Sequence, residues 1–520
     1  MQKLNTQPPK IKCQGNVMNA VSITGALSLL LALPSLASTE GYFAKTRGYR
    51  VEPEPDPPSY VRNLSKTQFE QFRDVEWLDV GLDFRSRYEY RENDYRPYTD
   101  RSSGAAVSKY RADPDNLWLL RTRAYVGIKD ILDPLRFAVE VEDARSYNGL
   151  YGKTNADVNE FELIQGYAEL YFKNALGYNR PISVRAGRMS LELLDRRLVG
   201  NNQFRNTTNN FDGFRVHFGK NTNIWDLDTF ALQPVERLKY RFDLPDEDTW
   251  FYGGVLSLRQ WSDFITIQPY FLGRKVNGDP YNSVAANRKN DMDIYSPGLR
   301  VYGVAGDSGF DFDADINKQF GRFGYTRTGV ATQLNLQHDA LAYSLETGYT
   351  FKHDWKPRAS LYYGYGTGDN EPNRNASSGS NERFDAFYGF NQPWSRNDYF
   401  SWDNIHAPKA RLEFTPYKDV RIDTAYNAYW LENETAAWNR ANLQDASGQS
   451  GNFIGHEFDI RMRHQLNPYA SWSLSYAHFT PGDFTTSLAK ANGPYTTEPT
   501  NFFYFEVSLN AFGDGKPKQK

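Results

Sequence analysis

Arginine recurs at alternating positions of several short segments, and it is the residue type in this chain that could do chemistry. Its planar guanidinium group binds a carboxylate through two parallel hydrogen bonds, so a row of arginines could guide a uronate or another acidic polymer. The alternative is that these arginines only neutralise neighbouring acids, and the sequence leaves both interpretations open. The candidates for a substrate path are Arg85, Arg87, Arg121, Arg123, Arg136, Arg185, Arg215, Arg411, Arg421, Arg461 and Arg463.

Carboxylate pairs such as Glu140 with Glu142, or Asp311 with Asp313, could in principle do acid–base work. We favour ion pairs with arginines of neighbouring strands, because neither a nucleophile nor a histidine accompanies these pairs in the sequence. The seven histidines show no metal-ligand spacing. We therefore predict no catalytic residue, no metal site and no cofactor, and we expect that the protein is not an enzyme.

The arginines lie on segments whose polarity has a period of two. At residues 78–90 the even positions are mostly apolar or aromatic, whereas the odd positions carry most of the charges. Successive side chains of a strand point to opposite faces, so one face is apolar and the other is charged. The same alternation returns, strongly or weakly, at residues 118–128, 135–142, 161–172, 182–188, 214–218, 250–258, 310–317, 410–414, 420–427 and 458–463.

The composition favours a barrel that crosses a membrane. Aromatic residues make up 15% of the chain although the mean hydropathy is only −0.69. A transmembrane barrel combines an apolar, aromatic exterior with a polar interior. A soluble sandwich or propeller would alternate too, but no blade-like repeat of ~40 residues is present. We predict an all-β, antiparallel up-and-down transmembrane barrel with long extracellular loops and about sixteen to twenty strands.

The chain begins like an exported protein. Lys3, Lys10 and Lys12 precede an apolar run at residues 21–33, which is too short to span a membrane, and small residues follow near Ala37. Cys13 is the only cysteine, so the mature chain would have none. Loss of the signal removes three lysines and no acid, which moves the net charge from −3 to about −6 and disfavours nucleic acid as a partner.

We divide the chain into four parts. Residues 1–38 are a predicted signal peptide, 39–70 a Pro-rich periplasmic lead-in, 71–512 the outer-membrane barrel and 513–520 a polar C-terminal tail. Segments rich in Gly, Asn, Ser and Asp at residues 367–401 and 432–452 are predicted to be long extracellular loops. The aromatic alternation at residues 503–512 resembles the last strand of outer-membrane barrels.

Several blocks in this order resemble the bacterial alginate export family. Residues 187–189, 195–200 and 211–215 resemble its signature, and residues 85–92, 361–369, 454–459 and 475–484 resemble further strands and turns. The similarity spans residues 50–512 or so. The motif positions, which we expect to be structural, are Gly187, Arg188, Asp195, Arg197, Gly200, Asp212, Gly213, Gly368, Asp369, Glu457, Asp459, Pro481, Gly482 and Asp483.

The resemblance implies an outer-membrane porin of about 18 strands that passes secreted alginate, a polyuronate, through an arginine-lined constriction. It also implies periplasmic secretion partners if the pathway is shared. Ser473 and Ser475 stand where the alginate porin carries constriction arginines, which leaves other polymers or small solutes as cargo.

We thus expect a monomeric barrel in the cell outer membrane, in contact with lipid and lipopolysaccharide, that passes an anionic exopolysaccharide. The alternatives are a diffusion porin for small solutes or ions and a barrel that sheathes a partner protein.

Overall fold

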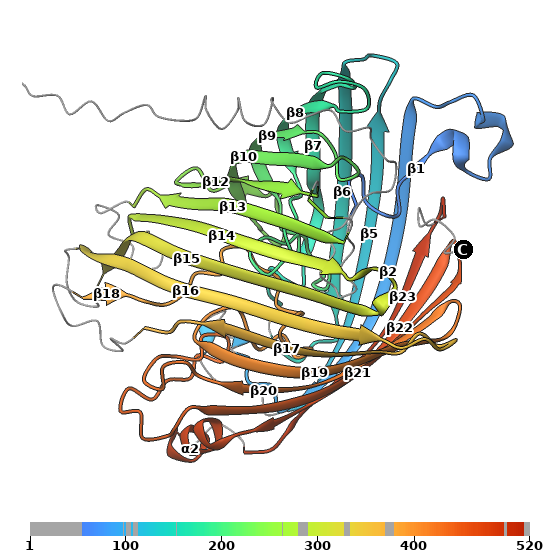
Figure 1. The fold of residues 1–520 in the computed structure, drawn as a ribbon. Helices are drawn as coiled ribbons and strands as arrows, with labels where there is room; N and C mark the ends of the chain where they lie inside the picture. Colours follow the sequence, from blue (N-terminus) through green and yellow to red (C-terminus); the bar gives the residue numbers. More distant parts are fainter. Residues whose placement is uncertain are drawn as a thin grey trace, which may run out of the picture. The chain divides into compact units, whose positions relative to one another are not determined.

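The structure, a computed structural model, describes residues 55–96, 98–99, 106–107, 113–151, 153–259, 261–262, 264–278, 290–326, 333–369, 379–492 and 497–513. The predicted signal peptide and most of the predicted C-terminal tail lie outside these residues. Eighteen long antiparallel strands form one sheet, in which strands that follow one another in the chain are neighbours (Figure 1). The last strand pairs with the first, for example Phe84 with Leu509, so the sheet closes into a barrel.

The barrel strands are, in chain order, β2 (Leu78–Glu92), β5 (Asp115–Ile128), β6 (Leu135–Tyr147), β7 (Asn159–Phe172), β8 (Ile182–Met189), β9 (Phe211–Phe218), β10 (Trp225–Glu236), β12 (Thr249–Leu258), β13 (Ile265–Val276), β14 (Met292–Val304), β15 (Phe310–Thr326), β16 (Gln333–Thr350), β17 (Arg358–Gly366), β19 (Ile405–Tyr417), β20 (Val420–Trp430), β21 (Phe453–Asn467), β22 (Ala470–Pro481) and β23 (Thr500–Asn510). The predicted fold class is confirmed, and every segment predicted from its alternation overlaps one of these strands.

Shorter elements decorate the barrel. They are β1 (Arg62–Asn63), β3 (Tyr98–Thr99), β4 (Ala106–Val107), β11 (Leu244–Pro245), β18 (Ser380–Asn381), the 3-10 turns η1 (Leu64–Lys66), η2 (Glu70–Phe72) and η3 (Gly306–Ser308), and the helix α2 (Asp483–Asn492). Within the described ranges, no helix has both the length and the apolar character needed to cross a membrane.

The barrel has its apolar side chains outside and its charges inside. On β2, Leu82 is 41% exposed, whereas Arg85 and Arg87, which point the other way, are 4% and 1% exposed. The outer face carries further exposed Val, Ile, Leu and Phe side chains on most of the strands. Such a distribution suits hydrocarbon outside and polar contacts inside.

The two ends of the barrel differ in the length of their connections. Two-residue turns at residues 418–419 and 468–469 lie at the end where the chain enters β2, and we call this the short-turn end. The opposite end carries long connections, among them residues 190–210, 367–404 and 431–452. In barrels of this kind the short turns face the periplasm and the long loops face the exterior.

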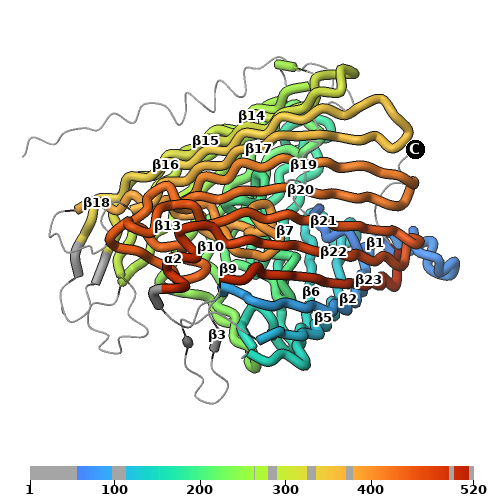
Figure 2. The backbone as a smooth tube through the Cα atoms, turned by 90° about the horizontal axis from the view of Figure 1, so that it is seen from below, coloured from blue at the N-terminus to red at the C-terminus, as the bar shows by residue number. Residues whose placement is uncertain are grey.

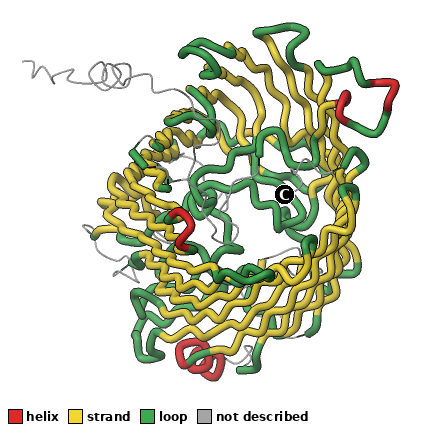
Figure 3. Tube along the Cα trace, turned by 45° about the vertical axis from the view of Figure 1, so that its right-hand side comes forward, coloured by secondary structure: helices red, strands yellow, loops and turns green. Residues whose placement is uncertain are grey.

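Two of the long connections fold back into the barrel. Figure 3 shows loop segments inside the ring of strands, and Figure 2 shows neighbouring strands side by side along the barrel wall. We call residues 190–210 the first inner segment and residues 379–404 the second inner segment. The sequence predicted residues 367–401 only as a long outer loop, so the inward course of its described part is a difference from that prediction.

Candidate functional site

A cavity of about 2100 Å³ lies at the short-turn end of the barrel. Its wall comes from barrel strands and from the turns at residues 219–221, 418–419 and 465–468, and its floor includes Leu193, Phe204 and Phe390 from the two inner segments. We call this cavity the vestibule. Thirteen Lys and Arg side chains line it against eight Asp and Glu side chains, although the whole chain has a net charge of −3.

The predicted path arginines fall into two groups. Six of them line the vestibule, namely Arg85, Arg185, Arg215, Arg421, Arg461 and Arg463. The others lie away from it, and Arg136 pairs with Asp130 and Asp133 beside the short turn between β5 and β6. All of them have hydrogen-bond or ion-pair partners, so none is a free cation waiting for a ligand.

Four arginines of β2 and β5 hold the first inner segment. Arg85 donates to the carbonyl oxygens of Gln203 at 2.7 Å and Arg205 at 2.8 Å. Arg87 donates to the carbonyl of Phe204 at 2.6 Å, and Arg121 reaches that of Gln203 at 3.4 Å. Arg123 donates to Thr208 and to Glu142. Buried carbonyl groups need donors, and these guanidinium groups supply them.

The family-motif residues at the base of the first inner segment clamp its two ends together. Arg188, which precedes the segment, makes paired hydrogen bonds of 2.8 and 2.9 Å to Asp212, which follows it, and another of 2.9 Å to Glu162. Gly187 and Gly213 are cross-strand partners with φ values of 126° and 149°, which favour glycine. A side chain on Gly187 would collide with the backbone of β7, and one on Gly213 with the backbone of β10.

Inside the barrel the two inner segments pack on each other. The amide of Gly200 donates to the carbonyl of Tyr388 at 3.1 Å, and the amide of Phe390 donates to that of Arg196 at 2.8 Å. A Cβ on Gly200 would lie 3.1 Å from that of Phe390, so the small residue permits this approach. The motif residues Asp195 and Arg197 are buried and pair with each other.

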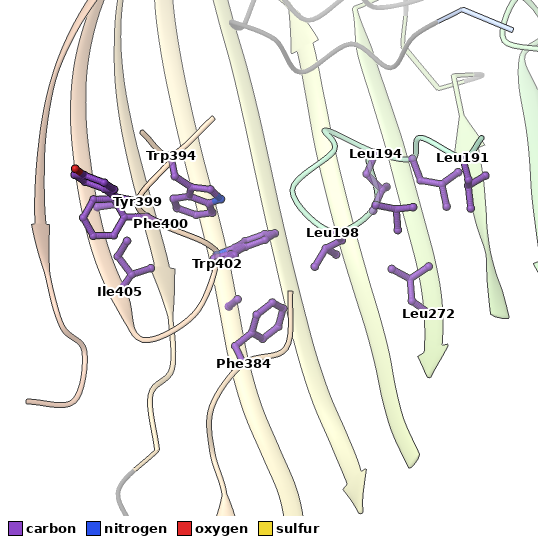
Figure 4. Close-up of a cluster of buried hydrophobic side chains, with 14 of the residues drawn as sticks. Leu191, Leu194, Leu198, Leu272, Phe384, Trp394, Tyr399, Phe400, Trp402 and Ile405 are labelled. Carbon is purple, nitrogen blue, oxygen red and sulfur yellow. The ribbon is translucent and has the colours of Figure 1, made fainter. Parts of the chain in front are cut away.

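An apolar core forms around this junction. Figure 4 shows leucines of the first inner segment beside aromatic side chains of the second, all inside the strands. Phe400 stacks on Trp438 with ring centroids 5.3 Å apart and an interplanar angle of 11°, which adds the connection between β20 and β21 to the core. The residues labelled in Figure 4 are Leu191, Leu194, Leu198, Leu272, Phe384, Trp394, Tyr399, Phe400, Trp402 and Ile405.

The second inner segment is anchored to β21 by two motif carboxylates. Glu457 accepts hydrogen bonds from the Ser395 hydroxyl at 2.6 Å, the Arg396 amide at 2.7 Å and the Asn397 side chain at 2.8 Å. Asp459 accepts from the Arg396 guanidinium group at 3.1 Å. The segment therefore places its own charges and amides against acids that belong to the barrel wall.

The remaining motif residues close the ends of loops. A side chain on Gly368 would collide with Asn404, where the second inner segment returns to the wall, and Asp369 is buried beside it. Pro481 ends β22, the Gly482 amide donates to the Ile454 carbonyl at 2.7 Å, and Asp483 begins α2.

An ion pair links the inner segments at the long-loop side. Arg205 of the first lies 3.1 Å from Asp398 of the second, and Arg440 lies 2.8 Å from the same carboxylate. Burial raises the pKa of Asp398, but attraction to Arg205, Arg440 and Arg96 outweighs it, so this pKa lies below its ordinary value. The carboxylate thus stays ionised at neutral pH, and the link is lost only as the pH falls through that lowered pKa.

The wall formed by β19, β20 and β21 carries arginines that share acids. Arg396, Arg461 and Arg463 all contact Asp423, at 2.6, 2.9 and 3.1 Å. Arg421 lies 3.1 Å from Glu413, and Arg411 lies 3.4 Å from Glu346. Arg421 and Arg463 are directly opposite each other on neighbouring strands. Like charges in this arrangement repel, so an anion nearby would stabilise them.

On the opposite side of the vestibule, Arg185 and Arg215 also form a cross-strand pair. Arg185 lies 3.2 Å from Glu169, and Arg215 makes paired contacts with Asp228, the closest at 2.6 Å. Within the described residues, no cluster of His, Cys, Asp and Glu has the arrangement of a metal site.

The inner segments are the feature that sequence analysis missed. Residues 384–402 contain eight aromatic side chains in nineteen positions, which is too apolar for a loop exposed to water. Arg91, Arg300, Arg358 and Arg396 also carry buried ion pairs or anchors without appearing among the predicted arginines. The high density of aromatic residues outside the alternating segments was the signal that could have indicated a buried loop.

Comparisons with known proteins identify the family of this chain and support its fold. The family model described as alginate export matches residues 76–497. No curated protein matches the sequence significantly. Among solved structures, the chain is similar to OccAB1 of Acinetobacter baumannii, with 12% identity, a TM-score of 0.53 and coverage of 86% of this chain and 99% of that chain.

Two Pseudomonas aeruginosa proteins are similar to the same degree. OpdK, solved with vanillate, has 10% identity and a TM-score of 0.51 over 83% of this chain and 98% of its own. OccK2 (OpdF), solved in complex with glucuronate, has 10% identity and a TM-score of 0.50 over 83% and 96%. At this identity the likeness shows the fold alone.

Glu457→Ala should release the second inner segment from the wall. Removing a buried carboxylate that serves three donors costs about 3–5 kcal/mol, so we expect a larger and noisier single-channel conductance and faster proteolysis within residues 391–397. Glu160→Ala, which removes an exposed carboxylate at the same end of the barrel, is the control. Unchanged conductance and proteolysis in the Glu457 variant would show that this anchor does not hold the segment.

Proposed function

The chain belongs to the alginate export family of outer-membrane β-barrel channels, and we propose that it carries an anionic exopolysaccharide, an alginate-like polyuronate, across the outer membrane. The observation that carries the proposal is the vestibule, where cationic side chains outnumber acidic ones in a protein of negative net charge. A cavity whose lining has an excess of one sign of charge concentrates ions of the opposite sign. The family is one of channels rather than enzymes.

The arrangement of the arginines supports transport rather than tight binding. A conducting site must bind weakly at several places, because a polymer held tightly at one place would not leave. Each vestibule arginine already has an acidic or backbone partner, which weakens its attraction for a passing carboxylate. Arginines on both sides of the cavity would bind each uronate carboxylate in turn as the polymer moves through.

Small carboxylates are the second candidate cargo, in keeping with a diffusion porin. The two inner segments lie inside the ring of strands and form a packed apolar core there, which favours a narrow passage. Two proteins of the same fold are named with the carboxylates vanillate and glucuronate. A barrel that sheathes a partner protein has less support, because the chain's own segments already occupy the interior.

The short-turn end is where periplasmic secretion partners would approach, since the vestibule lies there. Partners, monomeric state and lipopolysaccharide contacts remain predictions from the sequence.

A hexauronate should block the channel from the vestibule side in planar bilayers. We expect block at a concentration at least about tenfold lower than for a neutral hexasaccharide, which corresponds to a difference of about 1.4 kcal/mol in binding. High salt should weaken the block because the attraction is electrostatic. Equal block by the neutral and acidic oligomers, or none by either, would contradict a polyuronate path.

Arg461→Ser with Arg463→Ser should move ion selectivity towards cations. Both side chains line the vestibule, so their loss should lower the chloride-to-potassium permeability ratio by about twofold or more. The matched control removes two arginines outside the vestibule, Arg73→Ser with Arg322→Ser, whose side chains are largely exposed. The same reversal potential in the wild type, the Arg461 and Arg463 variant and the control variant would show that these arginines do not lie on the conduction path.

A further inference from the structure

A short N-terminal segment enters the barrel at the short-turn end. Residues 55–61 precede β1, and Pro55, Asp56 and Ser59 line the vestibule. Tyr60 anchors the segment, because its ring is buried and its hydroxyl donates to Glu140 on β6. Gly81 of β2 leaves room for that ring, since a Cβ there would lie 2.7 Å from it. The anchor holds the preceding residues inside the cavity.

Asp56 of this segment meets the arginine pair of β8 and β9. Arg185 Nη1 lies 2.7 Å from Asp56 Oδ2, and Arg215 Nη1 lies 3.6 Å from the same oxygen. The two arginines are directly opposite each other on adjacent strands, so a carboxylate between them offsets their repulsion. Within the described residues, Arg185 Nε has no hydrogen-bond acceptor, which leaves this guanidinium group with a further donor.

The contact is accessible and only partly formed. The Asp56 side chain is 40% exposed, so it is reached by the water of the cavity. Its contact with Arg215 is longer than a hydrogen bond. Surrounding protein raises the pKa of Asp56, but attraction to Arg185 and Arg215 outweighs that effect and lowers the pKa, so the carboxylate is charged at neutral pH.

The wall does not depend on Asp56 for its own pairing. Besides Asp56, Arg185 contacts Glu169 and Arg215 contacts Asp228, and both of these acids belong to barrel strands. Asp56 instead comes from a segment outside the barrel strands. Another carboxylate of suitable reach can therefore take its place without rearranging the barrel.

We propose that Arg185 and Arg215 form a carboxylate-binding subsite of the transport path, and that Asp56 occupies this subsite in place of a cargo carboxylate when no cargo is present. The inference deepens the proposed function and rests on it for the identity of the cargo as a uronate. Because Tyr60 tethers Asp56 close by, a free carboxylate must compete with a ligand of high effective concentration.

Asp56→Asn tests the subsite, with block by hexauronate and binding of monomeric glucuronate measured on the full chain in planar bilayers. Removing an internal competitor raises apparent affinity by the inverse of the free fraction of sites, so we expect about a tenfold lower blocking concentration. Glu70→Gln removes a charge from an exposed residue of the same N-terminal region and should leave block unchanged. Heat-dependent gel mobility verifies that each barrel is folded.

The arginines are tested by adding Arg185→Gln and Arg215→Gln to the Asp56→Asn protein, which should abolish the gain. Equal block in wild type and Asp56→Asn, or a gain that survives loss of both arginines, would overturn the inference. If hexauronate blocks no variant while glucuronate still binds more tightly to Asp56→Asn, the subsite stands and the proposed polymer cargo is wrong.

Discussion

The low-dielectric surroundings of a membrane barrel decide on which face of its membrane-spanning strands the buried charges lie. A closed sheet satisfies the backbone, and its outer face within the hydrocarbon must then be apolar, so charged side chains of that part of the strands have to point inward. On β2 this separates Leu82 from its inward neighbours Arg85 and Arg87. Once charges are gathered inside, they must find partners, because a buried charge without one is costly.

The protein provides these partners in two ways. Neighbouring strands supply acids, as Glu413 and Asp423 do for the arginines of β20 and β21. The inner segments supply backbone carbonyls and side chains, as Gln203 and Phe204 do for Arg85 and Arg87. The contacts that give the buried arginines of the wall their partners therefore also hold the two inner segments inside the barrel. Motif residues hold the ends and anchors of these loops. They are Arg188, Asp212, Glu457 and Gly368.

The barrel was predictable because alternation in β2, β6, β20 and β21 is a local signal that the strand itself generates. Part of β16 was harder, because its first half reverses the pattern and buries Leu336 and Ala340 towards the second inner segment. The sequence marked eleven arginines but could not say which face the vestibule. Which arginines face the vestibule depends on where the inner segments lie. Their position depends on residues distant in the chain, because Glu457 binds Ser395 and Arg396, about sixty positions earlier.

Thiol labelling directly tests which face of the barrel wall meets water and which meets lipid. Cys13 is the only cysteine of the chain and falls in the predicted signal peptide, so single cysteines can be introduced on β21 without background. In vesicles, Arg463→Cys should react rapidly with a small anionic thiol reagent, because position 463 faces the vestibule. Ile460→Cys, on the outer face of the same strand, should be protected by lipid. Rapid reaction of the Ile460 variant with protection of the Arg463 variant would contradict this orientation of β21.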